Sequence, residues 1–597
     1  MKSKTAWIDA GLFRHLLRRF WPLYLGYFVL LVLLLPASLP GTLDPSGPDA
    51  FNLGFVYAVL EKSSASVVLS FAAGFAFAGA MFHFLYQSRS CGMIHSLPLR
   101  RETIFTTSWL AGLLPMLLAD LLVMLITWLV NLDGGVRVFE SLVTWLWATV
   151  LANLFFYHFA VLCALLTGNL VILPLVYVVL NFTAIVVETC AAELMSDLLY
   201  GVVLSSGRLA WASPFVFMLL QLHASPVITN GAMSGYALEG LGALGVYALV
   251  SPLFLALALW LYRRRQLECA SDVVAVPVLK PIFKYCMCFG TALVFATMML
   301  NILELNGALY GWTGALILLL LLLAGAFLGY FAAEMLLRKS LRAFRGTWRG
   351  FLVSAVVLCL LLVVVKTDVF GVERRVPAPD EVRMVSLSPN SDFDDAKEIA
   401  AVTQFHRHLI AHGPANTGDA SCDSCNGVCL NYTLSNGRSL QRWYDIYACD
   451  ETLAEEYLAL INLPGAILSR LTIEETETVW IDNYPQKQSM QISAGMVERV
   501  NEYDWSTLLE LTASEARELY EQGVLPDARA GRIDLRRQID DYFGSREDDV
   551  IIEITVSSAM NNEFEGYSHT LLIRICPESE NTLRWLAAHG LELELKN

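Results

Sequence analysis

The sequence predicts a polytopic α-helical membrane protein with a C-terminal α+β soluble domain. The chain has 597 residues and is 56% hydrophobic but only 16% charged, which is far more apolar than a soluble protein of its size. Residues 1–366 hold 22 Lys and Arg against 16 Asp and Glu, whereas residues 367–597 hold 19 against 40. A basic apolar part joined to an acidic polar part indicates at least two domains in two different solvents.

Apolar segments in the basic part are long enough to cross a hydrocarbon core roughly 30 Å thick. We count nine of them, so the ends of this part are expected on opposite sides of the membrane. The predicted spans lie near residues 20–40, 65–86, 106–130, 142–166, 170–190, 239–262, 284–303, 312–333 and 350–367.

Lysine and arginine orient these spans. If the N-terminus is cytoplasmic, the inside segments hold eighteen of these residues and the outside loops hold only Lys62, Arg137 and Arg208. Because positive charge accumulates in cytoplasmic loops, the distribution indicates this orientation. It places residues 368–597 outside the cytoplasm.

Residues 1–20 are amphipathic, with Trp7 and Leu12 set against Arg14 and Arg18. A cleavable signal peptide does not fit, because the apolar run that follows has the length of a span. The pattern favours an interfacial elbow helix that leads into the first span. An ordinary basic flank is the alternative.

The segment Tyr86–Leu113 separates the second and third predicted spans and is polar, basic and partly helical. Its Leu-Pro-Leu step is stiffened by proline, and a helical pattern resumes directly after it. Such a segment suits contact with a motor protein on the cytoplasmic side. A solvated loop whose charges only set the topology is the alternative. The candidate contact residues are Arg89, His95, Leu97, Pro98, Arg100, Arg101 and Glu102.

Residues 95–105, HSLPLRRETIF, resemble the SLP-x-x-R-x-x-[IL] segment of permease subunits of ABC type-2 exporters, in the form common in Gram-positive bacteria. An amphipathic elbow precedes the first span, and a long segment at 191–238 lies where that family has a re-entrant helical hairpin. The stretch Leu261–Tyr285 follows the sixth span, as in larger members with extra spans and an extracytoplasmic domain. The likeness covers about residues 1–350 well and the tail more loosely.

The resemblance implies a domain order in a bacterial plasma membrane. One departure concerns docking, because many relatives carry a lysine where Ser108 or Trp109 stands here. The implied order is an elbow helix at 1–20, a six-span permease core at 21–262 with a re-entrant segment at about 191–238, three additional transmembrane helices at 263–367 and an extracytoplasmic domain at 368–597.

The sequence contains no G-x-x-x-x-G-K-[ST] motif, so the chain has no such phosphate-binding loop of its own. The resemblance therefore implies a separate cytoplasmic ABC ATPase that carries ATP and Mg²⁺, and a second permease, identical or different, in the same lipid bilayer. We expect neither a cofactor nor nucleic acid for this chain. The expected function is export by a non-enzymatic transport subunit. The alternatives are a sensor or accessory subunit, whose outer domain binds a peptide antibiotic or envelope ligand, and, placed last, a membrane enzyme.

Ionisable groups inside spans are costly and need a reason, about 2.5–3.5 kcal/mol for an aspartate at a helix centre. Asp120 and Glu188 are candidates for a polar translocation path. The alternatives are an interhelical hydrogen-bond partner for Asp120 and an interfacial position for Glu188. His158 is expected to be a neutral hydrogen-bond partner, and Glu334 to pair with Arg338 one helical turn on.

The acidic tail holds two groups that metals or redox chemistry use. Cys422, Cys425 and Cys429 form C-x₂-C-x₃-C, with Cys449 twenty residues further on. This spacing allows zinc, an oxidising compartment favours disulfides, and free thiols are the third possibility. His408 and His412 share a helix face with His406 nearby, which allows a metal site or three ordinary histidines.

Strands and helices alternate in the tail without a repeating βαβ order, which predicts an α+β domain. We expect a hairpin at 430–448 around Asn436-Gly437, suited to a two-residue type I′ turn, and a capping box formed by Thr512 and Glu515. The other expected elements are strands at 382–387, 550–558 and 567–575 and helices at 393–412 and 578–589.

Overall fold

The computed structural model divides the chain into two compact units. The helical unit comprises Met1–Glu193, Ser206–Leu305 and Leu316–Leu361, and the C-terminal unit comprises Leu194–Ser205, Asn306–Ala315 and Leu362–Asn597. The structure describes all residues except 1–6, 40–47, 133–134, 230–231, 266–271, 306–308, 310, 341–346, 388–390, 414–424, 448–450, 472–475, 482–483, 502–503, 534–548, 559–567 and 594–597.

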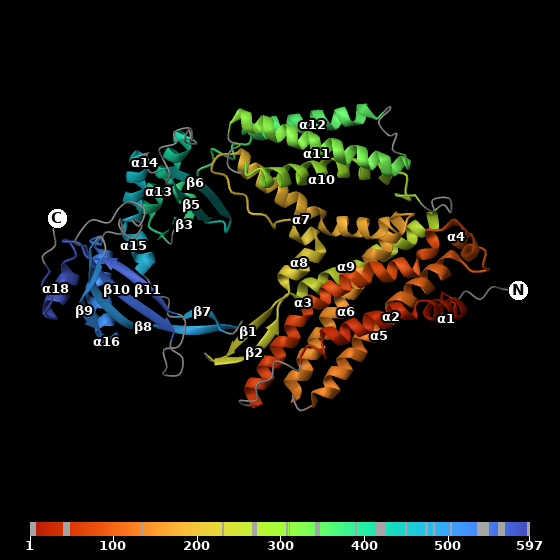
Figure 1. The fold of residues 1–597 in the computed structure, drawn as a ribbon, viewed down its shortest axis with the longest axis horizontal. Helices are drawn as coiled ribbons and strands as arrows, with labels where there is room; N and C mark the ends of the chain where they lie inside the picture. The colour runs from red at the N-terminus through yellow and green to blue at the C-terminus, as the bar shows by residue number, and fades with distance from the viewer. Residues whose placement is uncertain are drawn as a thin grey trace. The chain divides into compact units, whose positions relative to one another are not determined.

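Long helices form most of the helical unit (Figure 1). A short 3-10 turn, η1 (His83–Leu85), precedes α4, and another, η3 (Ala210–Ala212), precedes α8. The helices are α1 (Ala10–Arg19), α2 (Trp21–Leu34), α3 (Pro48–Met81), α4 (Ser88–His95), α5 (Arg101–Val130), α6 (Gly135–Leu166), α7 (Ile172–Leu198), α8 (Pro214–Gln221), α9 (Leu241–Arg264), α10 (Leu279–Ile302), α11 (Trp312–Arg338) and α12 (Trp348–Lys366).

Within the described residues, 8 helices are long and apolar enough to cross a membrane, or up to 9 if the bent pair α1–α2 is one span. This confirms the predicted polytopic helical part, and such helices are those of a membrane-embedded protein. The first predicted span, 20–40, differs because α2 has only 14 residues and meets α1 at a bend of 61°. Pro22 accounts for the break, since it has no N–H to continue the hydrogen bonds of α1.

Helix α6 lies at the centre of one apolar core and packs against α3, α5 and α9 (Figure 1). Its Trp145 and Tyr157 are fully buried. Aromatic contacts join it to its neighbours, with ring centroids 5.4 Å apart for Phe71 and Phe156 and 6.0 Å apart for Phe155 and Phe254. This tight packing holds the ends of α3, α5 and α9 in fixed relation, and those ends carry the candidate site.

Helices α10, α11 and α12 pack on one another through small and aromatic residues. Gly325 and Gly329 lie one turn apart on α11. A Cβ added to Gly325 would lie 2.7 Å from the backbone oxygen of Thr291, and one added to Gly329 would lie 2.4 Å from the backbone oxygen of Met287. Glycine therefore lets the backbones of α10 and α11 meet, as in the small-xxx-small pattern of membrane helices.

The segment 191–238, expected to be re-entrant, is only partly helical in its described residues. Helix α7 continues to Leu198, and the rest contains α8 and an antiparallel pair, β1 (Ala224–Thr229) and β2 (Ala232–Leu238). The run Val227-Ile228-Thr229 explains the strand, because β-branched side chains fit a pleated surface better than a helix.

The C-terminal unit contains antiparallel sheets and short helices, in agreement with the α+β prediction. One sheet has the order β4-β3-β5-β6, and the other has the order β11-β10-β8-β7 with β9 paired to β8. The strands are β3 (Val382–Leu387), β4 (Ser391–Phe393), β5 (Cys425–Leu434), β6 (Ser439–Tyr447), β7 (Thr476–Ile481), β8 (Tyr484–Asn501), β9 (Asp504–Leu511), β10 (Asp549–Ser558) and β11 (Ser568–Arg574). The helices are α13 (Ala396–His412), α14 (Glu451–Ile461), α15 (Pro464–Leu471), α16 (Ala513–Leu519), α17 (Leu525–Arg529) and α18 (Glu580–Ala588).

Local signals in the tail are confirmed, with one difference. Thr512 and Glu515 form the predicted capping box at the start of α16. Strands β5 and β6 form the predicted hairpin, but only Gly437 in its turn has a positive φ, of 79°. A type I′ turn needs a positive φ at both central residues. Asn436 does not have a positive φ, so the turn is not of type I′. The Gly437 N–H instead donates to Leu434 O at 2.9 Å, which gives a longer turn with glycine at its end.

Candidate functional site: the basic end of the helical unit

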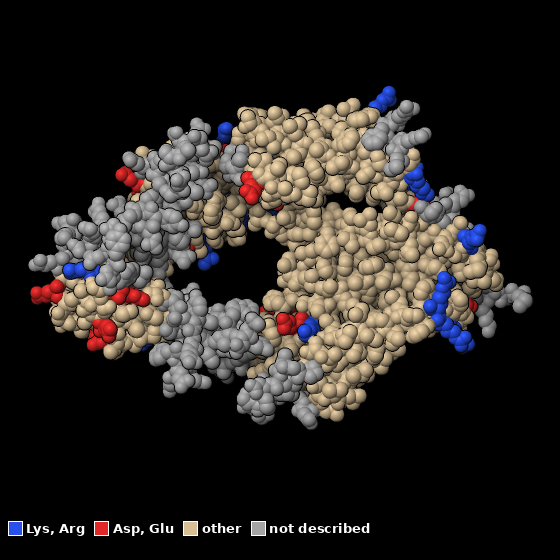
Figure 2. Space-filling model, in the orientation of Figure 1, with Lys and Arg blue, Asp and Glu red and all other residues tan. Residues whose placement is uncertain are grey.

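The candidate contact segment lies where the polar ends of α3, α5 and α9 meet. Lys and Arg gather at this end, around α1 and α4 (Figure 2). Helix α4 follows α3 through η1, and α5 begins at Arg101 after the Leu-Pro-Leu step. We call residues 88–100 the α4 knob.

The α4 knob has a defined backbone. Ser96 N–H donates to Gly92 O at 3.0 Å and ends α4. Leu99 N–H then donates to Leu97 O at 2.7 Å, which closes a three-residue turn around Pro98. Proline suits the centre of that turn, because its ring fixes φ. The step is therefore a fixed corner between two helices.

The outer surface of the α4 knob combines apolar and basic groups. Met93 is 63% exposed and Leu97 is 40% exposed, although both are large apolar side chains. Arg89, Pro98 and Arg100 are exposed beside them. The segment lies between two spans and not within one, so bilayer hydrocarbon does not account for these exposed side chains. Sequence reasoning missed Met93, whose exposure depends on the rotation of α4.

The other three candidate contact residues point inward. His95 Nδ1 lies 2.8 Å from Cys91 O, which only accepts, so Nδ1 carries the proton. His95 Nε2 then accepts from the Tyr262 hydroxyl at 3.1 Å. Tyr262 is buried near the end of α9, so this bond ties α4 to that helix.

Arg101 and Glu102 both bind the end of α9. Arg101 Nη1 donates to Arg263 O at 3.1 Å and to Arg265 O at 3.2 Å, which satisfies carbonyls that the helix end leaves without partners. Glu102 Oε1 lies 3.2 Å from Arg263 Nε. The candidate residues thus divide in two. Arg89, Leu97, Pro98 and Arg100 are exposed, whereas His95, Arg101 and Glu102 hold the segment in place.

Further bonds connect this end of the unit to α6, α10 and α11. Arg265 Nη1 donates to Leu165 O at 2.9 Å. The Asp272 carboxylate lies 2.8 Å from Lys339 Nζ and 3.7 Å from Lys280 Nζ, and the Lys339 hydrogen bond lowers the pKa of Asp272. The Asp272 carbonyl also accepts from Gly168 N–H at 2.8 Å.

Asp120 is fully buried between α2, α5 and α6. Its Oδ1 accepts from the Tyr27 hydroxyl at 2.8 Å and its Oδ2 from Asn153 Nδ2 at 2.7 Å. Asn153 Nδ2 also donates to the Tyr27 oxygen at 2.8 Å. The three side chains thus form a hydrogen-bonded network between helices. This is the arrangement expected if Asp120 is an interhelical hydrogen-bond partner.

Glu188 lies near the end of α7 and accepts two backbone hydrogen bonds. Its Oε1 accepts from Arg208 N–H at 2.8 Å and its Oε2 from Leu209 N–H at 2.9 Å. The carboxylate therefore holds the chain that leads into η3. Of the other membrane residues, His158 Nδ1 lies 2.8 Å from Ser251 Oγ, and Glu334 binds Arg338 at 3.0 Å and Lys284 at 3.2 Å.

The cysteine prediction falls largely on residues that the structure does not describe. Cys422 and Cys449 lie outside the described residues, and Cys425 is described only as the first residue of β5. Cys429 is a buried free thiol whose sulfur accepts from Gln441 Nε2 at 3.3 Å. The described residues contain no group of three or more metal-ligating side chains, His406, His408 and His412 included.

A buried polar cluster in the C-terminal unit was not predicted. His406 on α13 lies between the hydroxyls of Tyr432, at 3.0 Å, and Tyr444, at 2.9 Å. Burial lowers the pKa of His406 to about 3, so the ring is neutral. Nearby Arg442 is 1% exposed and donates to Val372 O at 2.7 Å.

This cluster holds the chain that leaves α7. Trp443 N–H donates to Gly201 O at 3.2 Å, and Val202 forms an isolated bridge with Arg442. Lys366, the last residue of α12, donates to Leu198 O at 3.1 Å. The polar cluster therefore joins the ends of α7 and α12 to the first sheet of the tail. Successive side chains of a strand point to opposite faces, which places Arg442 on the inward face of β6. This alternation is the signal in the sequence that could have identified Arg442 as buried.

Comparison with known proteins returned no family model, no curated protein and no solved structure that matches this chain.

Proposed function

We propose that this chain is the membrane-spanning subunit of an ATP-driven exporter of the ABC type-2 kind, with ATP and Mg²⁺ bound by a separate cytoplasmic ATPase. One observation carries the proposal: the α4 knob presents Leu97 and Met93 between Arg89 and Arg100, outside any span, on a corner bonded to α9. Apolar anchors ringed by charge are typical of a docking surface.

The fixed corner also suits force transmission. A push on Leu97 reaches α9 through the His95–Tyr262 bond and the Arg101 contacts, and reaches α5 directly. ATP binding at the partner drives motion only if the partner binds one conformation of these helices better than another. A second permease copy would complete the translocation path, and the transported substrate is not defined by these features.

The arrangement of helix ends supports an extracytoplasmic tail. The end of α7, the α10–α11 connection and the chain after α12 all belong to the C-terminal unit. Because α9–α10 and α11–α12 are each a pair of spans in the proposed topology, the α10–α11 connection and the chain after α12 lie on the side where α9 begins. The basic ends of α9 and α11 lie on the other side, which the positive-inside rule makes cytoplasmic.

A photo-crosslinking experiment tests the docking proposal. A benzoyl-phenylalanine at Leu97 or Met93, in membranes of the source cells, should give an adduct with a protein that contains a phosphate-binding loop. The matched control is Trp211, which is 61% exposed before α8 and should give no such adduct. Adducts with lipid alone at both knob positions would contradict the proposal.

Charge reversal supplies a second test. Arg89→Glu and Arg100→Glu together should abolish co-purification of the ATPase while insertion and thermal stability stay unchanged, because both side chains are exposed. Single exposed ion pairs contribute only about 0–1 kcal/mol, so each single variant should retain partial binding. If the double variant co-purified with the ATPase and coupled normally, the charges of this segment would serve only to set the membrane topology.

A sensor or accessory subunit is the second candidate function, in which the tail binds a peptide antibiotic or an envelope ligand. It is favoured by the bonds from Arg442 and Trp443 to the segments that follow α12 and α7, since these suit transmission of a ligand signal. Deletion of residues 376–597 separates the candidates. Retained export would make the tail regulatory, and lost export with normal insertion would make it part of the transport path.

A further inference from the structure

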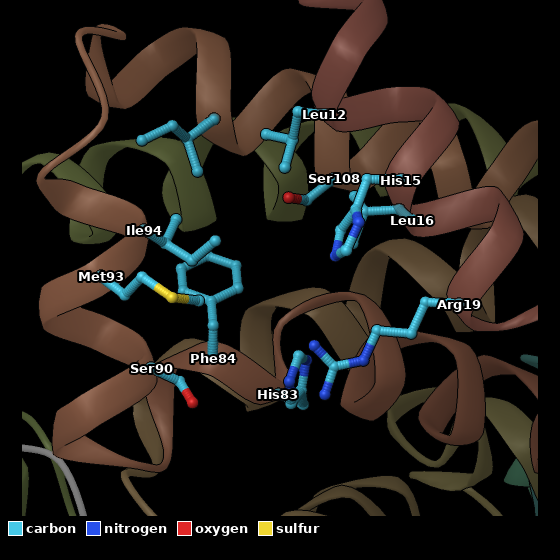
Figure 3. A pocket seen from close by; sticks show the side chains of 11 residues that line it. Leu12, His15, Leu16, Arg19, His83, Phe84, Ser90, Met93, Ile94 and Ser108 are labelled. Atoms are coloured by element: carbon cyan, nitrogen blue, oxygen red, sulfur yellow. The ribbon is translucent and has the colours of Figure 1, made fainter.

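A small pocket lies between the elbow helix α1, the η1–α4 segment and the first turns of α5 (Figure 3). Its volume is about 40 Å³. This exceeds the volume that a single water molecule occupies and is enough for a compact chemical group. Its apolar wall is formed by Leu12, Leu16, Phe84 and Ile104, which are all buried. Ser90, Met93 and Ile94 of the α4 knob also line the pocket.

The rim of the pocket is basic. His15 and Arg19 come from α1 and His83 from η1. The Arg19 guanidinium and the His83 ring point toward each other (Figure 3). No carboxylate lies within ion-pair distance of Arg19 among the described residues, and its guanidinium carbon lies 5.4 Å from the Phe20 ring centroid. Arg19 thus places on the rim a positive charge that no described carboxylate neutralises, whereas burial lowers the pKa of His83 and favours its neutral ring.

One buried polar group faces the pocket without a partner. Ser108 on α5 is 1% exposed, and its hydroxyl points into the pocket (Figure 3). None of the described residues forms a hydrogen bond with this hydroxyl. A hydroxyl in the lining of a pocket is open to a bound group, so Ser108 is positioned to donate a hydrogen bond to a ligand.

The position of the pocket selects the ligand class. Trp7 is 65% exposed and Trp21 is 59% exposed, and they flank the amphipathic helix α1. Exposed tryptophans at both ends of such a helix are typical of the membrane–water interface. At that depth the most abundant phosphate group belongs to a phospholipid, whose glycerol and first methylenes match the apolar wall.

We infer that this pocket binds the headgroup phosphate of an anionic phospholipid from the leaflet at the basic end of the helical unit. Arg19 and Ser108 donate to the phosphate oxygens, and Leu12 and Leu16 contact the glycerol end of the lipid. The lipid bridges α1 and α4, so it fixes the elbow helix against the segment that precedes the Leu-Pro-Leu step.

Native mass spectrometry of the full-length protein tests this inference. Protein in neutral detergent micelles with equal amounts of phosphatidylglycerol and phosphatidylcholine should retain phosphatidylglycerol preferentially. Arg19→Gln should lower that retention roughly tenfold, as expected when a charge-assisted hydrogen bond is lost. Arg18→Gln is the matched control, because it removes the same charge from a neighbouring exposed position outside the pocket. It should change retention less than about twofold.

Two further variants separate binding from folding. Arg19→Lys keeps the charge and should restore most of the preference, and Ser108→Val should weaken retention while α1 and its charges stay intact. If Arg18→Gln and Arg19→Gln lowered phosphatidylglycerol retention equally, the lipid would be held by general attraction to the basic surface and not by this pocket. Protection against thermal unfolding by inorganic phosphate as strong as that by phosphatidylglycerol would make a soluble phosphate the ligand and overturn the lipid assignment.

Discussion

Arg101 donates its Nη1 hydrogen bond to the backbone oxygen of Arg263 at 3.1 Å, so the first residue of α5 caps the end of α9. The neighbouring Arg100 is exposed and forms no such bond. Two adjacent arginines in one sequence motif therefore have different tasks: one stabilises the site and the other is available to a partner.

Substitution separates these tasks. Arg101→Met should lower the stability of the helical unit by about 1 kcal/mol, because the α9 carbonyls lose a charged donor at a partly exposed position. Arg100→Met should leave stability unchanged. Thermal unfolding of both variants in the same detergent measures the difference, and equal melting temperatures would show that the Arg101 contacts contribute nothing.

Asp120 offers a test between a translocation path and a structural role. Asp120→Leu should destabilise the helical unit by about 1–3 kcal/mol, because the Tyr27 hydroxyl and Asn153 amide then lack a buried acceptor. Transport and stability should fall together. Lost transport with full stability would instead favour the translocation path.

We expect glycine to be needed at position 201 for two reasons. Its φ is 70°, and its neighbours leave no space for a side chain. A Cβ there would lie 2.0 Å from the Tyr444 ring, whereas Gly371, with φ 64°, has open space around it. Both alanine variants bear the left-handed backbone cost of about 1–2 kcal/mol. Gly201→Ala should lose about 1–3 kcal/mol more through overpacking. Hydrogen exchange of the β5–β6 amides measures both, and equal protection would contradict the packing argument.

The neutral buried His406 predicts acid sensitivity of the tail. Burial lowers the pKa of its imidazole to about 3, whereas in the unfolded chain the pKa has its ordinary value of 6.5. Between these values the unfolded state binds the extra proton, so stability falls as the pH falls, with a limiting slope on the order of 1.4 kcal/mol per pH unit.

His406→Gln removes the titrating group and should flatten that slope. Protection of the β5–β6 amides, corrected for intrinsic exchange, should fall between pH 6 and pH 4 in the natural protein and change much less in the variant. His408→Gln is the control, since His408 is exposed beside Glu456. The same pH dependence in all three proteins would assign the effect to other groups.

The sequence alone determined where the membrane helices lie. Apolar length decides insertion, so eight of the nine predicted spans overlap long helices, although the span predicted at 65–86 begins well inside α3 and runs past its end at Met81. Local chemistry also determined the capping box at Thr512 and the hairpin of β5 and β6, because each depends on residues close together in the chain. The turn around Pro98 is likewise local, because its hydrogen bond joins Leu97 and Leu99.

Tertiary structure decided which candidate residues are exposed and which are held. Sequence spacing put Arg100, Arg101 and His95 in one motif, but only the packing of α9 against α5 turned Arg101 and His95 inward. The same holds for Asp120, whose partners Tyr27 and Asn153 come from α2 and α6. Hydrogen bonds between residues far apart in the chain depend on helix rotation and crossing, which a linear pattern does not specify, and this is why packing assigned these roles.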